Sequence, residues 1–464
     1  MQQYDLIIIG AGSGNSIVGP AFDDWSIAIV EEWVFGGTCL NRGCIPTKML
    51  VHTADVALTV EHAATYDIDA HLDKVHWTSV RDRVFGRIDP IAAGGERYRA
   101  FDCPNVTVHH GHARFVGPRR LSVTAPDGTV ETIEAQHVVV AAGARPMIPD
   151  IPGIHDVDVR ASVHTSDDIM RIDEVPEHLI VLGGGFIACE LAHVFGAYGA
   201  QVTIVQRSLQ LMRSEDHDIA AAITANFARR FDLRTGVHPE RISRTADGAI
   251  RVLLADGTAV EGSHLLVATG RVPNSDLLDA GGAGGLDLHP DGRIVVDLAQ
   301  RASLPGVWAL GDISSPFMLK HVANHETRVV AHNLAHPDDL RFTDHTAVPH
   351  AVFTNPQIAA VGMTEMEARA QGIDVMIATQ RYGDIAYGWA LEDTTSFCKL
   401  IADRSTRMLV GAHIIGPSAS SLIQQLVQGM RFGQSIDQLA TGQYYIHPAL
   451  GELVENALLN FPKA

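Results

Sequence analysis

The residues most able to do chemistry lie in one stretch, GGTCLNRGCIPTKM at positions 36–49, which holds two of the five cysteines of this 464-residue chain. Cys39 and Cys44 are five positions apart, and residues at that spacing on a regular α-helix have Cα atoms roughly 8–9 Å apart. A disulfide needs a Cα separation of about 4.4–6.8 Å. The spacing therefore predicts a departure from ideal helix between the cysteines, which Gly43 allows.

Such a pair could be a structural bridge, part of a metal site or a redox-active disulfide. As a structural bridge it is weak, because a loop this short contributes only about 2 kcal/mol on the entropic account. A zinc site would need two more cysteines or a Cys/His pair at ligand spacing, and no such pair lies close in the sequence. Lys48 follows Cys44 on the same helix face, and a cation and a helix N-terminus both lower the pKa of a thiol. We therefore interpret Cys39 and Cys44 as a redox pair without a metal.

A candidate acid/base lies near the C-terminus, in the stretch YIHPALGE at positions 445–452. Proline suits the first position of a helix, so Pro448 predicts that His447 lies at a helix start. Glu452 could orient the imidazole and raise its basicity, which favours general acid/base catalysis. The sequence holds 24 histidines, and a histidine satisfied in the core is the alternative interpretation of His447.

The elements that must position these groups begin with a glycine-rich turn, GAGSGN at 10–15, after a short apolar strand. Gly10 permits a tight turn, and Gly12 lets the backbone approach a pyrophosphate at the positive end of the helix that we expect next. Glu31, at the end of the following strand, can accept hydrogen bonds from a ribose. Asn15 replaces the usual third glycine or alanine, so a plain strand–turn–helix unit stays open as an alternative.

A second copy of this pattern, GGGFIA at 183–188, lies between a predicted strand at 179–182 and a predicted helix at 186–198. The next predicted strand, 201–205, leads to Arg207 and Arg213 rather than to a ribose-binding acid. A pair of guanidinium groups suits a 2′-phosphate, which predicts NADPH rather than NADH, with two solvated arginines as the alternative. Two dinucleotide sites in one chain are typical of a flavin enzyme that takes hydride from a nicotinamide.

The remaining pattern predicts the fold class. Each glycine motif opens a β-α-β unit, the signature of a doubly wound parallel sheet, and strands at 138–146 and 265–273 each end in a small–small–Gly turn. From about residue 348 the pattern changes to an antiparallel hairpin at 397–416 and helices at 419–432 and 448–460. We therefore predict an α/β protein with two doubly wound, Rossmann-like dinucleotide-binding domains and a third, C-terminal α+β domain. The expected bounds are 1–157 and 284–345 for the first dinucleotide-binding domain, 158–283 for the second and 346–464 for the α+β domain.

Composition limits the partners. A formal net charge of −19 speaks against nucleic acid or an anionic membrane as a partner, and the short N-terminal apolar run is not a signal peptide. A reducing cytosol is then the expected compartment, where structural disulfides are rare. The scattered Cys103, Cys189 and Cys398 are expected to be buried small hydrophobes.

These motifs together resemble the class I pyridine nucleotide-disulfide oxidoreductases. GGTCLNRGCIPTK is similar to the active-site signature of that family, and the similarity runs through both glycine motifs, ATGR at 268–271, Gly311-Asp312 and the terminal His447, Pro448 and Glu452. It covers essentially the whole chain. The resemblance implies FAD in the first domain, NADPH in the second and an interface domain that makes a homodimer.

The resemblance also implies a role for each reactive residue. Cys39 resembles the interchange cysteine that attacks the disulfide substrate, and Cys44 the thiol that contacts the flavin and forms the charge-transfer thiolate. Lys48 and Glu190 resemble the ion pair beside flavin N5.

Other positions follow from the same resemblance. His447 with Glu452 resembles the acid/base that reaches in from the partner subunit. Besides Cys39, Cys44 and Lys48, the positions implied for FAD are Gly10, Gly12, Ser13, Gly14, Glu31, Gly37, Thr38, Ala113, Ala142, Gly143, Arg271, Gly311 and Asp312, the last on the ribityl chain. The positions implied for NADPH are Gly183, Gly185, Phe186, Ile187, Glu190, Arg207, Arg213 and Gly270.

Smaller differences from individual members of the family indicate which substrate this chain reduces. Lipoamide dehydrogenases usually carry an acid where Arg207 stands, and glutathione reductases typically have tyrosine where Phe186 stands. Mercuric reductases and large thioredoxin reductases need a further C-terminal cysteine or selenocysteine centre, whereas the last cysteine here is Cys398. Stretches at 12–17, 84–91, 320–326 and 387–393 are most similar to the mycothione-reducing members, whose pattern includes Asn15.

We therefore expect NADPH-dependent reduction of mycothione, the disulfide of mycothiol. A dihydrolipoamide dehydrogenase or a glutathione-reductase-like enzyme is the alternative within the family. A flavin-bearing redox sensor without a disulfide substrate is the alternative from another class. Arg42, where related enzymes commonly have valine, departs from the family pattern and adds a positive charge beside the redox pair.

Overall fold

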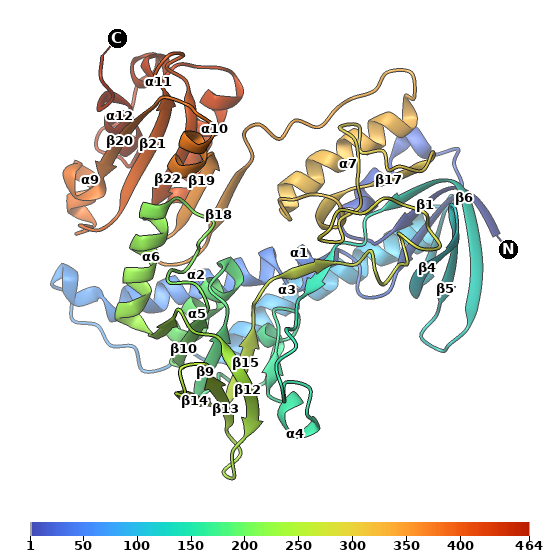
Figure 1. The fold of residues 1–464 in the computed structure, drawn as a ribbon, viewed down its shortest axis with the longest axis horizontal. Helices are drawn as coiled ribbons and strands as arrows, with labels where there is room; N and C mark the ends of the chain where they lie inside the picture. Colours follow the sequence, from blue (N-terminus) through green and yellow to red (C-terminus); the bar gives the residue numbers. More distant parts are fainter. Residues whose placement is uncertain (1, 464) are drawn as a thin grey trace. The chain divides into compact units, whose positions relative to one another are not determined.

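The computed structural model describes residues 2–463 and divides into two compact units. The first unit comprises residues 1–47, 79–147 and 270–344, and the second comprises residues 48–78, 148–269 and 345–464. Figure 1 colours the chain by residue number, so that the segments of each unit can be followed. Each unit is built around its own sheets.

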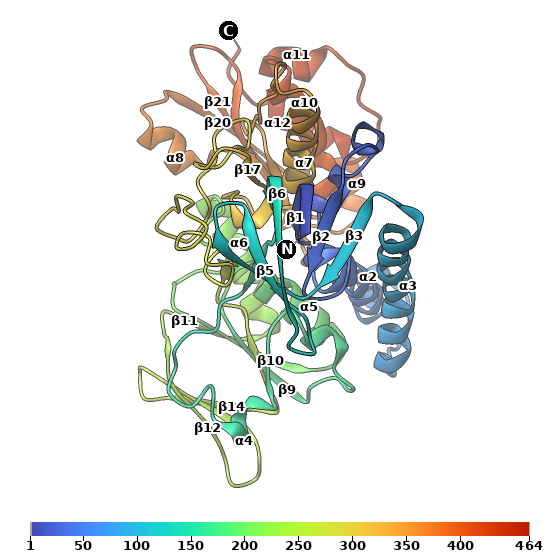
Figure 2. The same ribbon diagram turned by 90° about the vertical axis from the view of Figure 1, so that its right-hand side faces the viewer.

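A parallel sheet forms the centre of the first unit, and Figure 2 shows four of its strands, β3, β2, β1 and β6, side by side. All of β2 and the last four residues of β1 are buried, because a parallel sheet is covered on both faces. The long β6 continues into an antiparallel meander with β5 and β4. In spatial order the strands are β3 (Val106–His110), β2 (Ile27–Glu31), β1 (Gln2–Ile9) and β6 (Val130–Val140), with β17 (Val307–Ala309), β5 (Arg120–Thr124) and β4 (His112–Gly117) paired beyond β6.

The segment after the first glycine turn is not the α-helix that we expected. Two short 3-10 turns, η1 (Gly14–Ile17) and η2 (Pro20–Phe22), lie between β1 and β2 instead. Gly19 and Pro20 explain the difference, because glycine weakens a helix and proline removes a backbone donor and clashes with the preceding turn. The glycine motif predicted the strand and the turn, whereas these two helix-breaking residues determine the conformation of the segment after the turn.

The second unit contains a parallel sheet of the same kind, flanked by α5 and α6. Here the helix predicted after the second glycine turn is present. In spatial order the strands of this sheet are β11 (Asp232–Thr235), β10 (Gln201–Gln206), β9 (His178–Leu182), β15 (His264–Val267) and β8 (Val163–His164). A separate antiparallel sheet is formed by β12 (Pro239–Arg244), β13 (Ile250–Leu254) and β14 (Ala259–Gly262).

The two small–small–Gly turns lead into a pair of short strands of the first unit. β7 (Ala144–Pro146) and β16 (Arg271–Pro273) pair antiparallel with each other. They carry the chain out of the first unit after residue 147 and back into it at residue 270.

The C-terminal part of the second unit is an antiparallel sheet with helices, which confirms the predicted α+β class. The hairpin expected at 397–416 is present as β21 and β22, and α10 and α12 pack against the sheet. The strands in order are β18 (Pro349–Val352), β19 (Ile358–Gly362), β22 (Leu409–Ile415), β21 (Phe397–Asp403) and β20 (Val375–Arg381).

The helices complete both units. The α-helices are α1 (Gly37–Asn41), α2 (Cys44–Glu61), α3 (Trp77–Arg97), α4 (Val157–Arg160), α5 (Phe186–Ala197), α6 (His217–Arg230), α7 (Lys320–Ala335), α8 (Glu365–Ala370), α9 (Ala386–Ala390), α10 (Ala419–Arg431), α11 (Ile436–Thr441) and α12 (Gly451–Leu459). Shorter turns of 3-10 or π type are η3 (Ala63–Tyr66), η4 (Tyr98–Asp102), η5 (Ile169–Arg171), η6 (Gly311–Ile313) and η7 (Tyr382–Asp384). Among residues 2–463, none of the helices combines the length and the apolar character that a membrane crossing requires.

The last helix begins later than expected. We predicted a helix from Pro448, but α12 begins at Gly451, so His447 lies in the turn before the helix rather than at its start. The backbone N–H of Ala449 donates a hydrogen bond to Glu452 Oε2 at 3.4 Å, across this turn.

Candidate active site

The redox stretch forms two helices with a break between the cysteines, as the spacing predicts. α1 ends before Arg42, whose φ of −153° and ψ of 22° lie outside the helical region, and α2 begins at Cys44. A Cβ on Gly43 would lie 3.0 Å from the carbonyl oxygen of Thr38, so glycine relieves a close approach there. Cys39 is half-buried, Cys44 is exposed, and a hydrogen bond joins their thiols.

That hydrogen bond shifts the two thiols in opposite directions. The bond donated by Cys44 lowers the pKa of Cys39, while burial opposes the shift and the charge of Lys320 assists it. The same bond raises the pKa of Cys44. We had expected Lys48 to be the cation that favours the thiolate, whereas the cation acting on Cys39 is Lys320 of α7, which also donates to Ser13 Oγ at 2.8 Å.

Lys48 is held by charges and an aromatic ring within the second unit. Its Nζ lies 3.9 Å from the centroid of the Phe353 ring, and the backbone N–H of Phe353 donates to Glu190 Oε1 at 2.8 Å. Burial lowers the pKa of Lys48, and the negative charges of Asp55 and Glu190 oppose that shift. The structure thus brings Lys48 and Glu190, which the resemblance paired, to the same aromatic residue.

A buried chain of polar contacts ends at Asp55, and the sequence analysis missed it. His193 on α5 is fully buried, with Nε2 3.1 Å from Asp55 Oδ1 and Nδ1 3.2 Å from a guanidinium nitrogen of Arg230. Because a guanidinium only donates, Nδ1 accepts and Nε2 carries the proton that goes to Asp55. This chain fixes Asp55 near Lys48. The three residues are far apart in the sequence, so no local signal indicated them.

The first glycine turn lies directly against the start of the redox stretch. Gly37 has a φ of 64°, and a Cβ there would lie 2.8 Å from the Cα of Gly12. Glu31 is buried at the end of β2, where its carboxylate accepts the backbone N–H groups of Ala11 at 2.7 Å and Trp33 at 2.9 Å. The turn, Glu31 and the start of α1 therefore pack together in the first unit.

Asn15, the unusual member of the first motif, is held by a buried arginine. Arg99 is 8% exposed, and its Nε donates to Asn15 Oδ1 at 2.7 Å. Another guanidinium nitrogen of Arg99 donates to the carbonyls of Asn15 at 2.9 Å and Val18 at 3.1 Å. These bonds satisfy the carbonyls of a segment that forms no regular helix, and Arg99 was not among the residues that the sequence singled out.

Arg42, the departure from the family pattern, contacts an aromatic ring of the first unit. Its guanidinium lies 5.2 Å from the centroid of the Trp33 ring, in a cation–π contact within the first unit. The largest contributions to the pKa shifts of Cys39 and Cys44 come from their mutual hydrogen bond and from burial.

The second glycine turn excludes a side chain at its first glycine but has open space at its third. Gly183 has a φ of 120°, and a Cβ there would lie 2.3 Å from the carbonyl oxygen of Ala268. Gly185 precedes α5, no side chain caps that helix, and a Cβ at Gly185 would meet open space. Phe186 is exposed and Ile187 half-buried at the first helical positions, and Arg207 and Arg213 are exposed after β10.

A third group of predicted residues surrounds Asp312 in the first unit. Burial raises the pKa of Asp312, while the charges of Arg271 and Lys320 oppose the shift. The N–H of Gly311 donates to Glu326 Oε2 at 2.7 Å, and burial raises the pKa of Glu326 to about 7.

The neighbouring turn and strand supply further predicted positions. The carbonyls of Ala142 and Gly143 accept from Asn274 at 2.8 and 3.1 Å. The carbonyl of Gly270 accepts from Met147 at 2.9 Å, and the side chain of Ala113 is buried in the core, which leaves only its main chain for a ligand.

His447 and Glu452 form the predicted pair. His447 Nδ1 lies 2.6 Å from Glu452 Oε1, and the imidazole side chain is 71% exposed, which excludes the alternative of a core histidine. This contact uses Nδ1 of the imidazole.

Comparison with known proteins identifies the family. The family described as Pyridine nucleotide-disulphide oxidoreductase matches residues 4–327, and its dimerisation domain matches residues 348–458. The chain belongs to this family.

Its relatives share the whole length. The chain is 51% identical to a mycothione reductase of Mycobacterium tuberculosis, over 99% of both proteins. It is 32% identical to a glutathione reductase of Burkholderia cepacia, over 97% of this chain and 98% of that protein. Among solved structures, an HOCl-induced flavoprotein disulfide reductase of Escherichia coli, solved as a Cu(II) complex, has a TM-score of 0.87 at 28% identity, over 99% of both chains.

FAD and NADPH are the cofactors of this family, and the residues present fit both. For NADPH, the uncapped start of α5 and the open space at Gly185 admit a pyrophosphate. For FAD, Glu31 presents a fixed carboxylate, and Lys320 and Arg271 supply positive charge around Asp312. Within residues 2–463, no group of three or more His, Cys, Asp or Glu residues is placed to hold a metal ion.

Proposed function

We propose that the chain is an NADPH-dependent flavoprotein that reduces mycothione to two molecules of mycothiol through a Cys39–Cys44 disulfide. The observation that carries the proposal is the thiol pair, in which the Cys44 hydrogen bond lowers the pKa of Cys39. The mycothione substrate is supported by the 51% identical mycothione reductase. When bound, the flavin supplies the transfer of two electrons from NADPH to the disulfide.

The chain's own residues then carry out a thiol–disulfide exchange. The Cys39 thiolate attacks one sulfur of the substrate, which forms a mixed disulfide and breaks the substrate S–S bond. The departing thiolate takes a proton from His447, and Cys44, once deprotonated, attacks Cys39 and releases the second thiol. Each turnover thus consumes one NADPH and one proton and yields two thiols.

We propose for the site residues the roles that the family resemblance implies. The FAD-binding set is supported by the close packing of Gly12 against Gly37, by Glu31 and by the cations around Asp312. The NADPH-binding set is supported by the turn at Gly183 and by exposed Arg207 and Arg213.

The assembly and compartment are also proposals. The matched dimerisation domain supports a homodimer, in which His447 and Glu452 of each chain serve the thiols of the other. The expected domain bounds, 1–157 with 284–345, 158–283 and 346–464, are proposed unchanged. A cytoplasmic location suits an enzyme that keeps a thiol pool reduced.

Steady-state assays decide the substrate. We expect kcat/KM for mycothione to exceed that for glutathione disulfide and lipoamide, with NADPH preferred over NADH. Turnover of lipoamide as good as that of mycothione, with NADH preferred, would support the dihydrolipoamide dehydrogenase alternative instead. In Cys39→Ser, substrate reduction should disappear while NADPH still reduces the flavin.

A further inference from the structure

The loop that carries Arg213 is anchored on both sides. Met212, with a φ of 49°, donates its backbone N–H to the carbonyl of Gly184 at 2.7 Å, which ties this side to the second glycine turn. Asp216, three residues beyond Arg213, is 1% exposed and caps α6 by accepting the Asp218 N–H at 3.1 Å. Arg213 is exposed between these two anchors.

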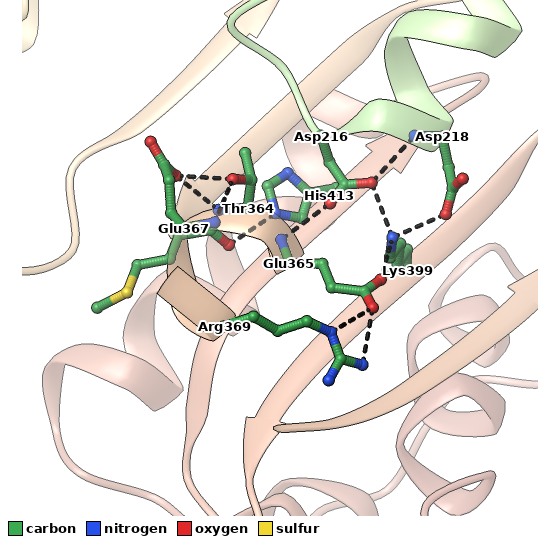
Figure 3. A network of polar contacts seen from close by, with 9 residues as sticks. Asp216, Asp218, Thr364, Glu365, Glu367, Arg369, Lys399 and His413 are labelled. Carbon is green, nitrogen blue, oxygen red and sulfur yellow. Dashed lines mark hydrogen bonds and ion pairs between the residues drawn. The ribbon is translucent and has the colours of Figure 1, made fainter. Parts of the chain in front are cut away.

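The second anchor is a charge cluster centred on buried Lys399 of β21, drawn in Figure 3. Lys399 Nζ lies 2.9 Å from Asp216 Oδ1, 2.7 Å from Asp218 Oδ2 and 2.8 Å from Glu365 Oε2. Asp216 Oδ2 accepts the backbone N–H of Glu365 at 3.0 Å, so both oxygens of the cap are used. Burial lowers the pKa of Lys399, but its carboxylate partners together raise it above the ordinary value, so the lysine stays charged.

Neighbouring groups strengthen the same anchor. Both oxygens of buried Glu215 contact His350 Nε2 of β18, at 2.8 and 3.0 Å. His413 of β22 is buried beside the carboxylates and donates through Nε2 to the carbonyl of Met363 at 3.0 Å. The two residues before α6 are therefore bonded to three elements of the C-terminal region, β18, β21 and α8.

We infer that Lys399 and Asp216 are positioning residues for nucleotide selectivity, because they hold Arg213 where its guanidinium can bind the 2′-phosphate of NADPH. The inference rests on the proposed function, in which Arg207 and Arg213 bind that phosphate. Guanidinium–phosphate bonds depend on a planar, fixed geometry, so a displaced loop weakens them strongly. NADH uses the same turn and helix but lacks the 2′-phosphate, so its binding does not depend on this anchor.

The test compares Lys399→Met and Asp216→Asn with the native holoenzyme. Adenosine 2′,5′-bisphosphate and 5′-AMP are titrated calorimetrically, because the two probes differ only in the 2′-phosphate. In both variants we expect the Kd of the bisphosphate to rise about tenfold, the effect of losing one charge-assisted hydrogen bond, while the Kd of 5′-AMP changes less than about twofold. The KM for NADPH should rise in the same proportion, with the KM for NADH and kcat nearly unchanged.

Asp216→Asn separates positioning from a long-range effect of charge. It removes a negative charge behind the loop, so charge alone predicts tighter binding of the bisphosphate, whereas a lost anchor predicts weaker binding. Tighter binding, no change, or an equal loss for both probes would overturn the inference. If Lys399→Met does not retain flavin, the nearly isosteric Asp216→Asn decides alone.

Arg407→Met is the matched control. It breaks a pair between the turn that joins β21 to β22 and helix α11, in which guanidinium nitrogens of Arg407 lie 2.6 Å from each carboxylate oxygen of Asp437. This change should leave both affinities unchanged. A selective loss of the bisphosphate in this control would overturn the inference. A native enzyme without preference for NADPH would contradict the proposed function itself.

Discussion

Cys44 donates a hydrogen bond to Cys39, and this contact lowers the pKa of one thiol and raises the pKa of the other. The first proton therefore leaves Cys39, the residue that we propose as the nucleophile. Because the thiolate is the attacking species in disulfide exchange, the arrangement favours attack by Cys39 before Cys44 reacts.

Removing the donor should raise the pKa of Cys39. In Cys44→Ala we expect the pH midpoint for alkylation of Cys39 to move upward by about one unit, the effect of one hydrogen bond to a charged group. The measurement is the rate of iodoacetamide modification of the reduced enzyme against pH, with Cys39 quantified by mass spectrometry. Cys103→Ala is the control. An alkylation midpoint of Cys39 that is unchanged in Cys44→Ala would contradict the inference that Cys44 lowers the pKa of Cys39.

Arg42 should not tune the thiols. Its guanidinium lies over Trp33, so Arg42→Val should leave the alkylation midpoint of Cys39 where it is. The variant should instead lose about 0.5–1 kcal/mol of stability, the usual size of an exposed cation–π contact, in urea unfolding. In the Arg42→Val background, Trp33→Leu should lower the free energy of unfolding by little more, because the contact is already lost. A shifted alkylation midpoint of Cys39 in Arg42→Val would show that Arg42 does act on the thiols.

The fold was predictable where the pattern is local. The apolar runs before Gly10 and Gly183 predicted the central strands, and the alternation around residues 397–416 predicted the hairpin. Proline residues made the predicted helix bounds wrong at two places. Pro20 removed the helix expected after the first turn, and Pro448 precedes the last helix instead of opening it.

The site was predictable in its residue types but not in its long-range partners. The cysteine spacing indicated a redox pair, yet the cation that acts on Cys39 comes from Lys320, far along the chain. Arg99 reaches Asn15 across 84 positions of the sequence, and Lys399 reaches Asp216 across 183. Such contacts depend on how the sheets bring distant segments together, which no spacing along the chain reveals.

Glu326 should make stability depend on pH. Its folded pKa is raised to about 7 from 4.5, so the folded state holds a proton that the unfolded state releases, and stability falls as pH rises between these values. At pH 8 the deficit is roughly 3 kcal/mol, at about 1.4 kcal/mol per unit. Glu326→Gln keeps an acceptor for the Gly311 N–H without the charge, and should therefore stabilise the protein.

The gain from Glu326→Gln should grow between about pH 5 and pH 7 and level off above, because the native carboxyl is then fully ionised. Urea unfolding at several pH values measures it. Glu261→Gln, which breaks an exposed pair with Arg251, is the control without such a trend. A gain independent of pH would show that Glu326 is not protonated in the folded protein.

Glu452 should act through His447 on only half of the catalytic cycle. Glu452→Gln keeps a hydrogen-bond acceptor near His447 Nδ1 but removes the carboxylate charge beside the imidazole. General acid catalysis contributes about 10²–10⁴-fold, so we expect reoxidation of the reduced enzyme by mycothione to slow by roughly 10²-fold. Reduction of the enzyme by NADPH should be unchanged in stopped-flow measurements. Glu455→Gln on the same helix is the matched control. Equal slowing of both half-reactions in Glu452→Gln would show that Glu452 is needed for folding or assembly rather than for proton transfer by His447.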